Sequence, residues 1–278
     1  MQHLFPSPAT RIGTLILCGA MMLAAACNAA AQTVRVGGTG SALGTVRLLA
    51  DAFNKREAMP AALTIVPNLG SSGAIRALQA GAIDVALISR PLKPEEAAAG
   101  LLGFEYGRSP FVFVTSKSGV KHITASMVAD VLSGRAASWP DGQPVRFVMR
   151  PQSDGDNVYL ASLAPAIDHA LKIAHTRPGM VSAATDQEAA DEAERLPGSL
   201  AVNTLALVLS EHRKLNVLAF DGATPSVKAL ASGTYPYFKP LLIVTRSTAG
   251  KNVQQFVEFF KSPQGRAILE ANGHVVTH

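Results

Sequence analysis

Three loops rich in glycine and hydroxyl side chains carry the residues best suited to binding chemistry. Gly37–Ser41 and Gly70–Gly73 each precede an amphipathic segment, and Ser89–Pro91 follows a third apolar run. The start of a helix has unpaired N–H groups and a partial positive charge, so it stabilises an oxyanion. Glycine lets the backbone approach a ligand closely, and hydroxyls donate further hydrogen bonds. The pattern therefore predicts a site for a small anion.

Each of these loops also has a simpler interpretation. Ser and Thr are ordinary helix caps, which stabilise a helix by about 1 kcal/mol without any ligand. Three such loops in succession, one of them with an arginine, favour a binding role. No Gly-Lys-Ser/Thr follows them, so they are not a Walker A loop. They are not the dinucleotide fingerprint either, because Gly44 stands one position too late after Gly38 and Gly40.

A fourth candidate segment is Arg150–Asn157, which also lies between a predicted strand and a predicted helix. Arg150 suits pairing with an oxyanion, or with a neighbouring aspartate that orients it. The alternative is an Asp-rich turn with a solvated arginine. Asp154 and Asp156 could in principle hold a metal, but two carboxylates on a turn more often only form the turn. We predict no metal and no cofactor.

The sequence offers little to an enzyme. None of the seven histidines has metal-ligand spacing such as His-Glu-x-x-His, and there is no Gly-x-Ser-x-Gly elbow. No nucleophile with an adjacent base is visible, which disfavours a hydrolase of phosphate esters. We therefore expect a binding protein and not an enzyme.

Short β-branched runs that alternate with amphipathic segments must position these loops. This alternation predicts βαβ units and an α/β fold with mostly parallel sheets flanked by helices. The predicted strands are Val34–Gly37, Leu63–Pro67, Val85–Ile88, Phe111–Thr115, Val145–Val148, Ser199–Val202, Val217–Ala219 and Leu241–Val244. The predicted helices are Thr45–Lys55, Ala74–Gln79, Pro94–Ala99, Ala125–Leu132, Val158–Ala164, Ile167–Ala174, Gln187–Leu196, Thr204–Ser210, Val253–Lys261 and Pro263–Asn272.

The two strongest extended runs, Phe111–Thr115 and Leu241–Val244, are candidates for strands that carry the chain between two lobes. This predicts a discontinuous lobe 1 over residues 32–114 and 240–278, and an inserted lobe 2 over residues 115–239. Two consecutive domains, or one larger sheet, fit the periodicity equally well.

Residues 1–31 are predicted to be a secretory signal peptide. Arg11 precedes an apolar run from Ile12 to Ala26, and small residues follow up to Ala31. The run is too short for a typical spanning helix. Cleavage after Ala31 fits the Ala-x-Ala rule, whereas lipidation of Cys27 is less favoured because Ala24 stands where such signals usually carry Leu. We expect a periplasmic protein; an uncleaved N-terminal anchor is the alternative.

Removal of this leader leaves no cysteine, because Cys18 and Cys27 both lie within it. Disulfides and thiolate chemistry are then excluded. The formal net charge falls only from +5 to +4, without the clustered Lys, Arg and aromatic residues of a nucleic-acid binder. A modest positive charge does suit the attraction of anionic solutes.

At these loops the sequence resembles the substrate-binding protein of high-affinity phosphate ABC transporters, which has a two-lobed type II periplasmic-binding-protein fold. The resemblance covers about residues 34–276 and rests on five segments: Gly38–Ser41, Gly70–Gly73, Asp84–Lys93, Ile123–Trp139 and Phe259–Val275. It implies a phosphate or related oxyanion ligand, an inner-membrane permease as partner and, we expect, a monomer. It implies a ligand-binding role for Thr39, Ser41, Ser71, Ser72, Ser89, Arg90 and Arg150. With the neighbouring residues of these loops, the predicted ligand-binding residues are Thr39, Gly40, Ser41, Ser71, Ser72, Ser89, Arg90, Arg150, Ser153 and Asp154.

The sequence departs from the family pattern after Arg150, where the family has Gly-Ser-Gly-Thr. Ser153 stands at the first Gly, Asp154 at the Ser and Asp156 at the Thr. A carboxylate beside an anion at 4 Å costs about 4 kcal/mol at an effective dielectric constant near 20. One carboxylate can accept the proton of HPO₄²⁻ and so reject sulfate. The second must pair with Arg150 or point away, unless the ligand also has a cationic or hydroxyl-rich part. The alternative function is a sensory or partner-binding module whose anion site has degenerated.

Overall fold

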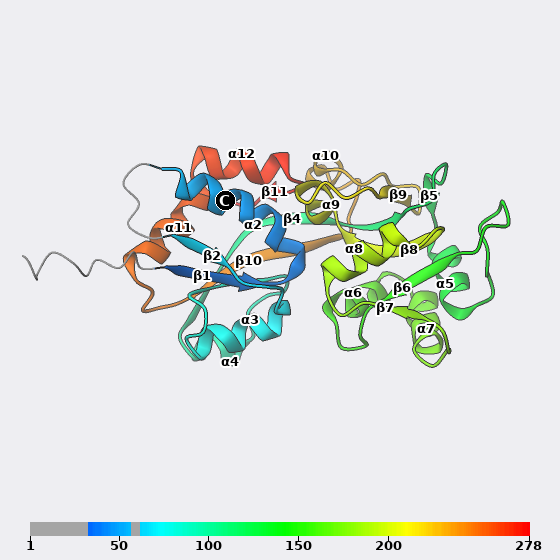
Figure 1. Cartoon of the computed structure of the whole chain (residues 1–278), viewed down its shortest axis with the longest axis horizontal. Helices are drawn as coiled ribbons and strands as arrows, with labels where there is room; N and C mark the ends of the chain where they lie inside the picture. Colours follow the sequence, from blue (N-terminus) through cyan, green and yellow to red (C-terminus); the bar gives the residue numbers. More distant parts are fainter. Residues whose placement is uncertain (1–32, 57–61) are drawn as a thin grey trace, which may run out of the picture.

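A computed structural model describes residues 33–56 and 62–278 of the chain. The predicted signal peptide and Cys27 lie outside these residues. Within the described ranges, no helix combines the length and the apolar character needed to cross a membrane. The molecule has two bodies side by side, and two long strands pass between them (Figure 1). We call the body at the chain's beginning and end lobe 1, and the other lobe 2.

Lobe 1 is built on a mixed sheet with strand order β2-β1-β3-β10-β4. The first three strands are parallel, whereas β10 runs antiparallel to both β3 and β4. The strands are β1 (Val34–Gly38), β2 (Leu63–Ile65), β3 (Val85–Ile88), β4 (Leu101–Thr115), β10 (Phe238–Arg246) and β11 (Val275–Val276). The helices are α2 (Gly40–Asn54), α3 (Gly70–Gln79), α4 (Pro94–Ala98), α11 (Lys251–Lys261) and α12 (Pro263–Ala271).

Lobe 2 continues from the far half of β4, in the strand order β4-β8-β6-β7. Here too the inner strands pair in parallel, and only β4 is antiparallel to its neighbours. The strands are β5 (His122–Ile123), β6 (Arg146–Met149), β7 (Val181–Ser182), β8 (Ser199–Thr204) and β9 (Asn216–Phe220). The helices are α5 (Ala125–Ser133), α6 (Gly155–Leu163), α7 (Pro165–Ala174), α8 (Asp186–Arg195), α9 (Leu205–Ser210) and α10 (Val227–Ala231).

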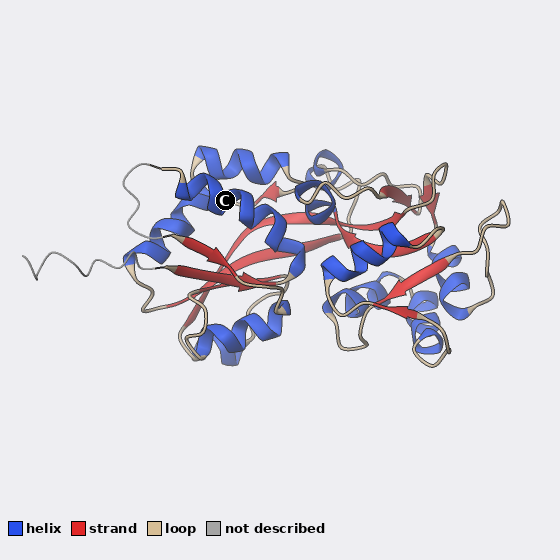
Figure 2. Ribbon diagram, in the orientation of Figure 1, coloured by secondary structure: helices blue, strands red, loops and turns tan. Residues whose placement is uncertain are grey.

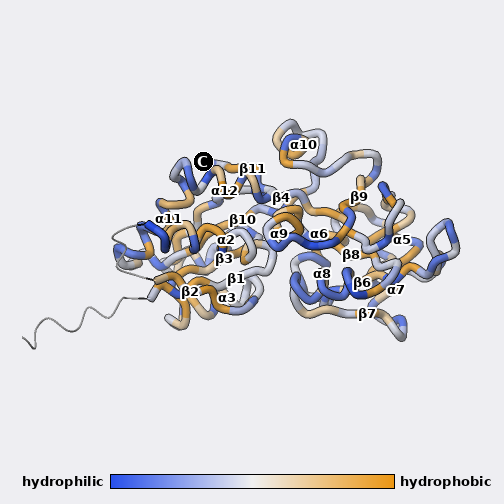
Figure 3. The backbone as a smooth tube through the Cα atoms, turned by 45° about the horizontal axis from the view of Figure 1, so that its top comes forward, coloured by the Kyte–Doolittle hydropathy of each residue, from blue (hydrophilic) through white to orange (hydrophobic). Residues whose placement is uncertain are grey.

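Helices cover both faces of each sheet (Figure 2). In lobe 1, α2, α11 and α12 pack on one face and α3 packs on the other. In lobe 2, α5, α6 and α7 cover one face, and α8 and α9 the other. Hydrophobic segments run along the strands in Figure 3, while hydrophilic segments gather on the outer loops. Each lobe therefore has its own core, as the two-lobed α/β prediction requires.

The residues in these cores divide between two parts of the chain. The lobe 1 clusters use residues up to Tyr106 and from Leu241 onward, and the lobe 2 clusters use residues from Phe111 to Tyr235. The proposed boundaries at 114/115 and 239/240 stay a prediction, which this separation of the cores supports. Both boundaries fall on, or beside, strands that pass between the lobes.

Several elements are longer than predicted. Helix α2 begins at Gly40 and not at Thr45, and α3 begins at Gly70 and not at Ala74. The Gly- and Ser-rich segments thus form the first turns of these helices, where their low helix propensity costs least. Strand β4 has 15 residues, of which only Phe111–Thr115 was predicted. Its first part is interrupted by Gly103, Gly107 and Pro110, which weaken a strand pattern.

Candidate ligand-binding cleft

A cleft of about 830 Å³ lies where the helix starts of the two lobes face each other. Lobe 1 lines it with the ends of its strands and the starts of α2 and α3, and lobe 2 with the starts of α6 and α8. Strand β10 contributes its first part. The polar residues that line the cleft are Thr39, Asn68, Ser71, Ser72, Arg76, Ser89, Arg90, Lys93, Arg150, Ser153, Asp154, Asp156, Tyr159, Ser162, Thr185, Asp186 and Lys239.

The start of α3 presents hydroxyl and amide groups to the cleft. Its N-cap residue, Leu69, has no side-chain cap, and Gly70 has the positive φ of 63° that favours glycine. The N–H of Gly70 donates to Asn68 Oδ1 at 2.9 Å. The Ser71 hydroxyl accepts the N–H of Ser89 at 3.0 Å, so the turn after β3 is tied to this helix start. Ser72 is exposed on the first turn. These groups line the cleft, and their role in binding an anion stays a prediction.

Arg90 borders the cleft, but a neighbouring carboxylate holds its guanidinium. It donates to the two carboxylate oxygens of Glu96 at 2.7 and 2.8 Å and to Pro91 O at 3.0 Å. This hydrogen bonding lowers the pKa of Glu96, against the effect of its burial. Arg90 therefore anchors the start of α4, and its positive charge is largely neutralised before any ligand binds.

The start of α2 lies against lobe 2. Thr39 lines the cleft, whereas Gly40 and Ser41 meet residues of α8. Gln187 Nε2 donates to Gly40 O at 3.0 Å, and the Ser41 hydroxyl donates to Asp186 at 3.4 Å. A Cβ on Gly40 would come within 2.5 Å of side-chain atoms of both α8 residues, so only glycine permits this approach. Gly40 and Ser41 thus form a contact between the lobes.

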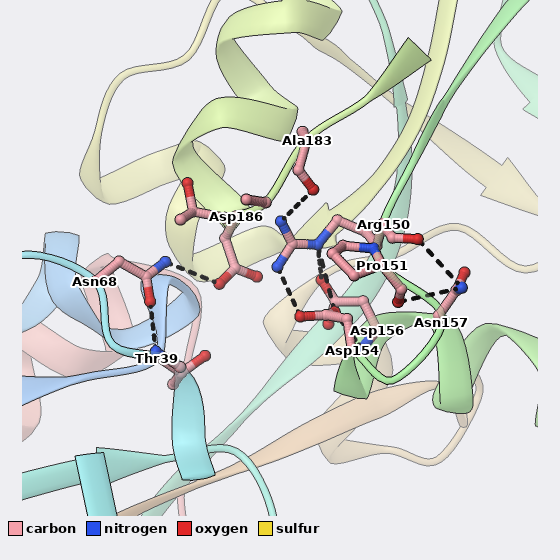
Figure 4. Close-up of polar contacts among 12 residues, drawn as sticks. Thr39, Asn68, Arg150, Pro151, Asp154, Asp156, Asn157, Ala183 and Asp186 are labelled. Atoms are coloured by element: carbon pink, nitrogen blue, oxygen red, sulfur yellow. Dashed lines mark hydrogen bonds and ion pairs between the residues drawn. The ribbon is translucent and has the colours of Figure 1, made fainter. Parts of the chain in front are cut away.

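Arg150 is buried directly after β6, and oxygen atoms of lobe 2 hold its guanidinium (Figure 4). It donates to the two carboxylate oxygens of Asp154 at 3.3 and 2.9 Å and to Ala183 O at 3.1 Å. Asp154 is also the N-cap of α6, where it accepts the N–H of Asp156 at 2.9 Å. Of the two interpretations of Arg150, the structure shows pairing with a neighbouring aspartate.

Asp156 is paired with Lys239, which reaches it from β10. Both side chains are buried, and Arg150 lies 3.9 Å from the other carboxylate oxygen of Asp156. Burial raises the pKa of Asp156 to about 7, although Lys239 opposes the shift; the nearby carboxylate of Asp186 raises it further. Burial also opposes the charge on Lys239, but Asp156 and Asp186 raise its pKa. Lys239 therefore stays cationic, whereas Asp156 gains a proton as the pH falls through about 7.

Asp186 begins α8 and reaches back to lobe 1. It is 5% exposed and receives hydrogen bonds from Ser41 at 3.4 Å and Asn68 at 3.5 Å. Burial opposes its ionisation, but Lys239, Arg150 and a hydrogen bond with Asp156 lower the pKa of Asp186. Of the two neighbouring carboxyl groups, Asp156 and Asp186, Asp186 is thus the one that is ionised.

The structure brings most of the predicted site residues to one cleft. Eight of them line it: Thr39, Ser71, Ser72, Ser89, Arg90, Arg150, Ser153 and Asp154. The prediction missed Asn68, Asp186 and Lys239. The start of α8 could have been recognised from the sequence as a helix start, because Thr185 is a typical N-cap residue. In the structure, Thr185 caps the helix by accepting the N–H of Glu188. Among the described residues, no group of three or more His, Cys, Asp and Glu side chains is arranged to hold a metal ion.

This fold and cleft define a class of two-lobed binding proteins. The model of the PBP superfamily domain matches residues 24–264, and the chain belongs to this superfamily. It is 26% identical over 213 residues to the phosphate-binding protein PstS of Borreliella burgdorferi, covering 73% of this chain and 76% of that protein.

Two solved structures show how widely this fold is shared. One, described as a phosphate ABC transporter substrate-binding protein with bound phosphate from Clostridium perfringens, has a TM-score of 0.74 and 18% identity, and covers 89% of this chain and 100% of that one. The periplasmic molybdate-binding protein of Azotobacter vinelandii has a TM-score of 0.62 and 18% identity, over 88% of this chain and 100% of that one. At this level of identity the likeness concerns the fold alone.

Proposed function

We propose that the protein is an extracytoplasmic solute-binding protein that captures phosphate or a related oxyanion and delivers it to an ABC importer. The observation that carries the proposal is the start of α3, where uncapped backbone and the hydroxyls of Ser71 and Ser72 face a cleft between two lobes. Such a helix start binds oxyanions through its N–H groups and dipole. The names of the relatives and the predicted signal peptide support the same role.

Capture would use the two strands that pass between the lobes. Strands β4 and β10 pair over nine residue positions, so a small bend in this ribbon rotates one lobe relative to the other. Closure around the ion would remove it from water and present a single closed surface to a membrane permease. We expect the protein to act as a periplasmic monomer, with no cofactor and no catalysis.

Calorimetry on the refolded, ligand-stripped chain tests this function. We expect heat with at least one of phosphate, a phosphonate, sulfate or molybdate, and weaker binding in Ser72→Ala. Ser118→Ala, a change outside the cleft, serves as the matched control. Absence of heat with all four anions would contradict the proposal.

A second candidate function is a sensory or partner-binding module on the same fold. It is favoured by the contacts of Arg150 with Asp154 and of Lys239 with Asp156, because side chains of the protein already occupy these cations. This function predicts no thermal shift with any oxyanion, together with retention on a partner receptor. A true ligand at a hundred times its Kd adds about 2.7 kcal/mol to the free energy of unfolding, so the two functions are easily separated.

A further inference from the structure

The two walls of the cleft differ in charge, and this difference points to a class of ligand. We propose that the cleft binds a small zwitterion in which a phosphate or phosphonate group is joined to a primary ammonium group. The inference rests on the proposed function, because lobe 1 still binds the anionic group. Lobe 2 then recognises the cationic group, and Asp186 is its main contact.

In lobe 2, a side chain of the protein already occupies the position of an oxyanion. The Asp154 carboxylate takes two hydrogen bonds from Arg150 and one from the first turn of α6. A guanidinium and a helix start are the donors that a bound phosphate would seek. Because Asp154 uses them, lobe 2 has few donors left for an external anion.

The remaining charges on this wall leave no excess of positive charge for an external anion. Arg150 and Lys239 face three carboxyl groups, those of Asp154, Asp156 and Asp186, of which Asp156 is partly protonated near neutral pH. Asp154 and Asp156 each lie within 4 Å of a cation, but in the described residues no ion pair of this length includes Asp186. Its contacts to the Ser41 hydroxyl and to Asn68 are long, at 3.4 and 3.5 Å.

The Asp186 carboxylate has no ion-pair partner within 4 Å among the described residues, although Lys239 and Arg150 stabilise its charge from farther away. Asp186 is 95% buried yet lines the cleft. Burial of a charge is costly unless it is paired and hydrogen-bonded. A ligand ammonium would supply both the missing charge and three N–H donors. A second anionic group at this place would instead be repelled by Asp186.

Lobe 1 provides the complementary wall. The start of α3 and the Arg76 guanidinium border the cleft there, while Arg90 is neutralised by Glu96. Asn68 connects the two walls, since its Oδ1 accepts the N–H of Gly70 and its Nδ2 approaches Asp186. An anionic site and a cationic site thus lie on either side of one asparagine, which matches a ligand with both charges.

The size of the cleft also suits an organic ligand. Its volume of about 830 Å³ falls within the range of roughly 300–1,000 Å³ in which small organic molecules bind. Val158 and Leu69, which are 62% and 38% exposed, are among its lining residues. These apolar side chains would contact the methylene groups that join the two charged ends of the ligand.

Calorimetry at neutral pH with four probes tests the inference on the ligand-stripped full chain. The probes are 2-aminoethylphosphonate, ethylphosphonate without the amine, ethanolamine without the anion, and inorganic phosphate. We expect 2-aminoethylphosphonate to bind at least about tenfold more tightly than ethylphosphonate, which corresponds to one charge-assisted hydrogen bond. Equal or weaker binding of 2-aminoethylphosphonate would overturn the inference that the ligand is a zwitterion, while leaving the proposed function intact. No heat with any of the three phosphorus compounds, and none with sulfate or molybdate, would instead overturn the proposed function.

The variant Asp186→Asn sharpens this test, because it should change the affinities for the two phosphonates in opposite directions. Loss of the carboxylate should weaken the binding of 2-aminoethylphosphonate and strengthen the binding of ethylphosphonate. The two affinities should then become equal, or their order should reverse. Asp141→Asn changes an exposed carboxylate outside the cleft and should preserve the wild-type preference. If Asp186→Asn also preserves the preference, Asp186 is not the cation site. If this variant does not fold, the comparison of the four probes on the wild-type chain still decides the matter.

Discussion

The two lobes place the same local structure at the cleft but give it opposite chemistry. In lobe 1, α3 begins with Gly70 and the hydroxyls of Ser71 and Ser72, and its N-cap has no side-chain cap. In lobe 2, α6 begins behind Asp154, whose carboxylate caps the helix and pairs with Arg150. The fold thus brings two helix starts to one cleft, whereas single residues at these helix starts set the local charge of each wall.

Removal of Arg150 is expected to have the largest effect on this arrangement. In Arg150→Met, the carboxylates of Asp154 and Asp156 lose a buried cation, and the free energy of unfolding should fall by about 3–5 kcal/mol. Urea denaturation measures this loss in the free energy of unfolding. Arg146→Met, an exposed change on the same strand, should cost less than about 0.5 kcal/mol. Equal losses in both variants would show that the charges of lobe 2 are not coupled in this way.

The pair of Lys239 and Asp156 should behave as a unit. At about pH 8, where Asp156 is ionised in the native protein, Lys239→Met leaves a buried carboxylate near Asp186, and we expect a loss of about 3 kcal/mol in the free energy of unfolding. In the double variant Lys239→Met with Asp156→Asn, no unpaired charge remains at Asp156, so at least half of this loss should be recovered. Simple additivity of the two single changes would argue against the pairing.

Ligand binding should reveal the difference between the walls more directly. Ser72→Ala removes a hydroxyl donor from the anion-binding wall of lobe 1 and should weaken oxyanion binding by about 1.5 kcal/mol, roughly tenfold. Ser153→Ala makes the same chemical change on lobe 2, where Asp154 dominates, and should change affinity less than twofold. Calorimetry with phosphate compares the two. A larger loss in Ser153→Ala would reverse the assignment of the walls.

The pH dependence of stability should show the proton on Asp156. The native state holds this proton up to a pH of about 7, whereas the unfolded chain releases it near pH 4. The native state therefore binds more protons between these values, and stability falls as the pH rises. Between pH 6 and pH 7 the contribution of Asp156 should decrease by about 1 kcal/mol.

Comparison with Asp156→Asn isolates this small effect. The stability of the variant should change less over the same interval, and the difference between the two curves removes the titration of groups they share. Arg150, Asp154, Asp186 and Lys239 are the charged groups that surround Asp156. Parallel curves for the two proteins would mean that Asp156 is already ionised at pH 6.

The sequence predicted the elements well where periodicity alone decides them. Strand β3, Val85–Ile88, has the predicted bounds, because four consecutive buried residues leave no ambiguity. Helix α2 was placed five residues late, since Gly40 and Gly44 look unfavourable for a helix. In the structure, these glycines let α2 approach Gln187 and Ser210 of lobe 2. This reason is tertiary and is invisible in a local pattern.

The site was predicted only as far as its helix starts. Ser71, Ser72, Ser89 and Arg150 could be found because each follows a strand in the sequence. Lys239 could not be found in this way, because its partner Asp156 is 83 residues away and only the passage of β10 between the lobes brings them together. The pairing of Arg90 with Glu96 was also missed, although the two are only six residues apart.

The position of β10 has a consequence for how the molecule assembles. This strand lies between β3 and β4, so the sheet of lobe 1 has a gap until residues 238–246 have been made. The core of lobe 2 is contiguous from Phe111 to Tyr235 and needs no later part of the chain. Since contacts between distant residues form slowly, we expect lobe 2 to fold first during synthesis or export. The arrival of Lys239 then completes the cleft in the same step that closes lobe 1.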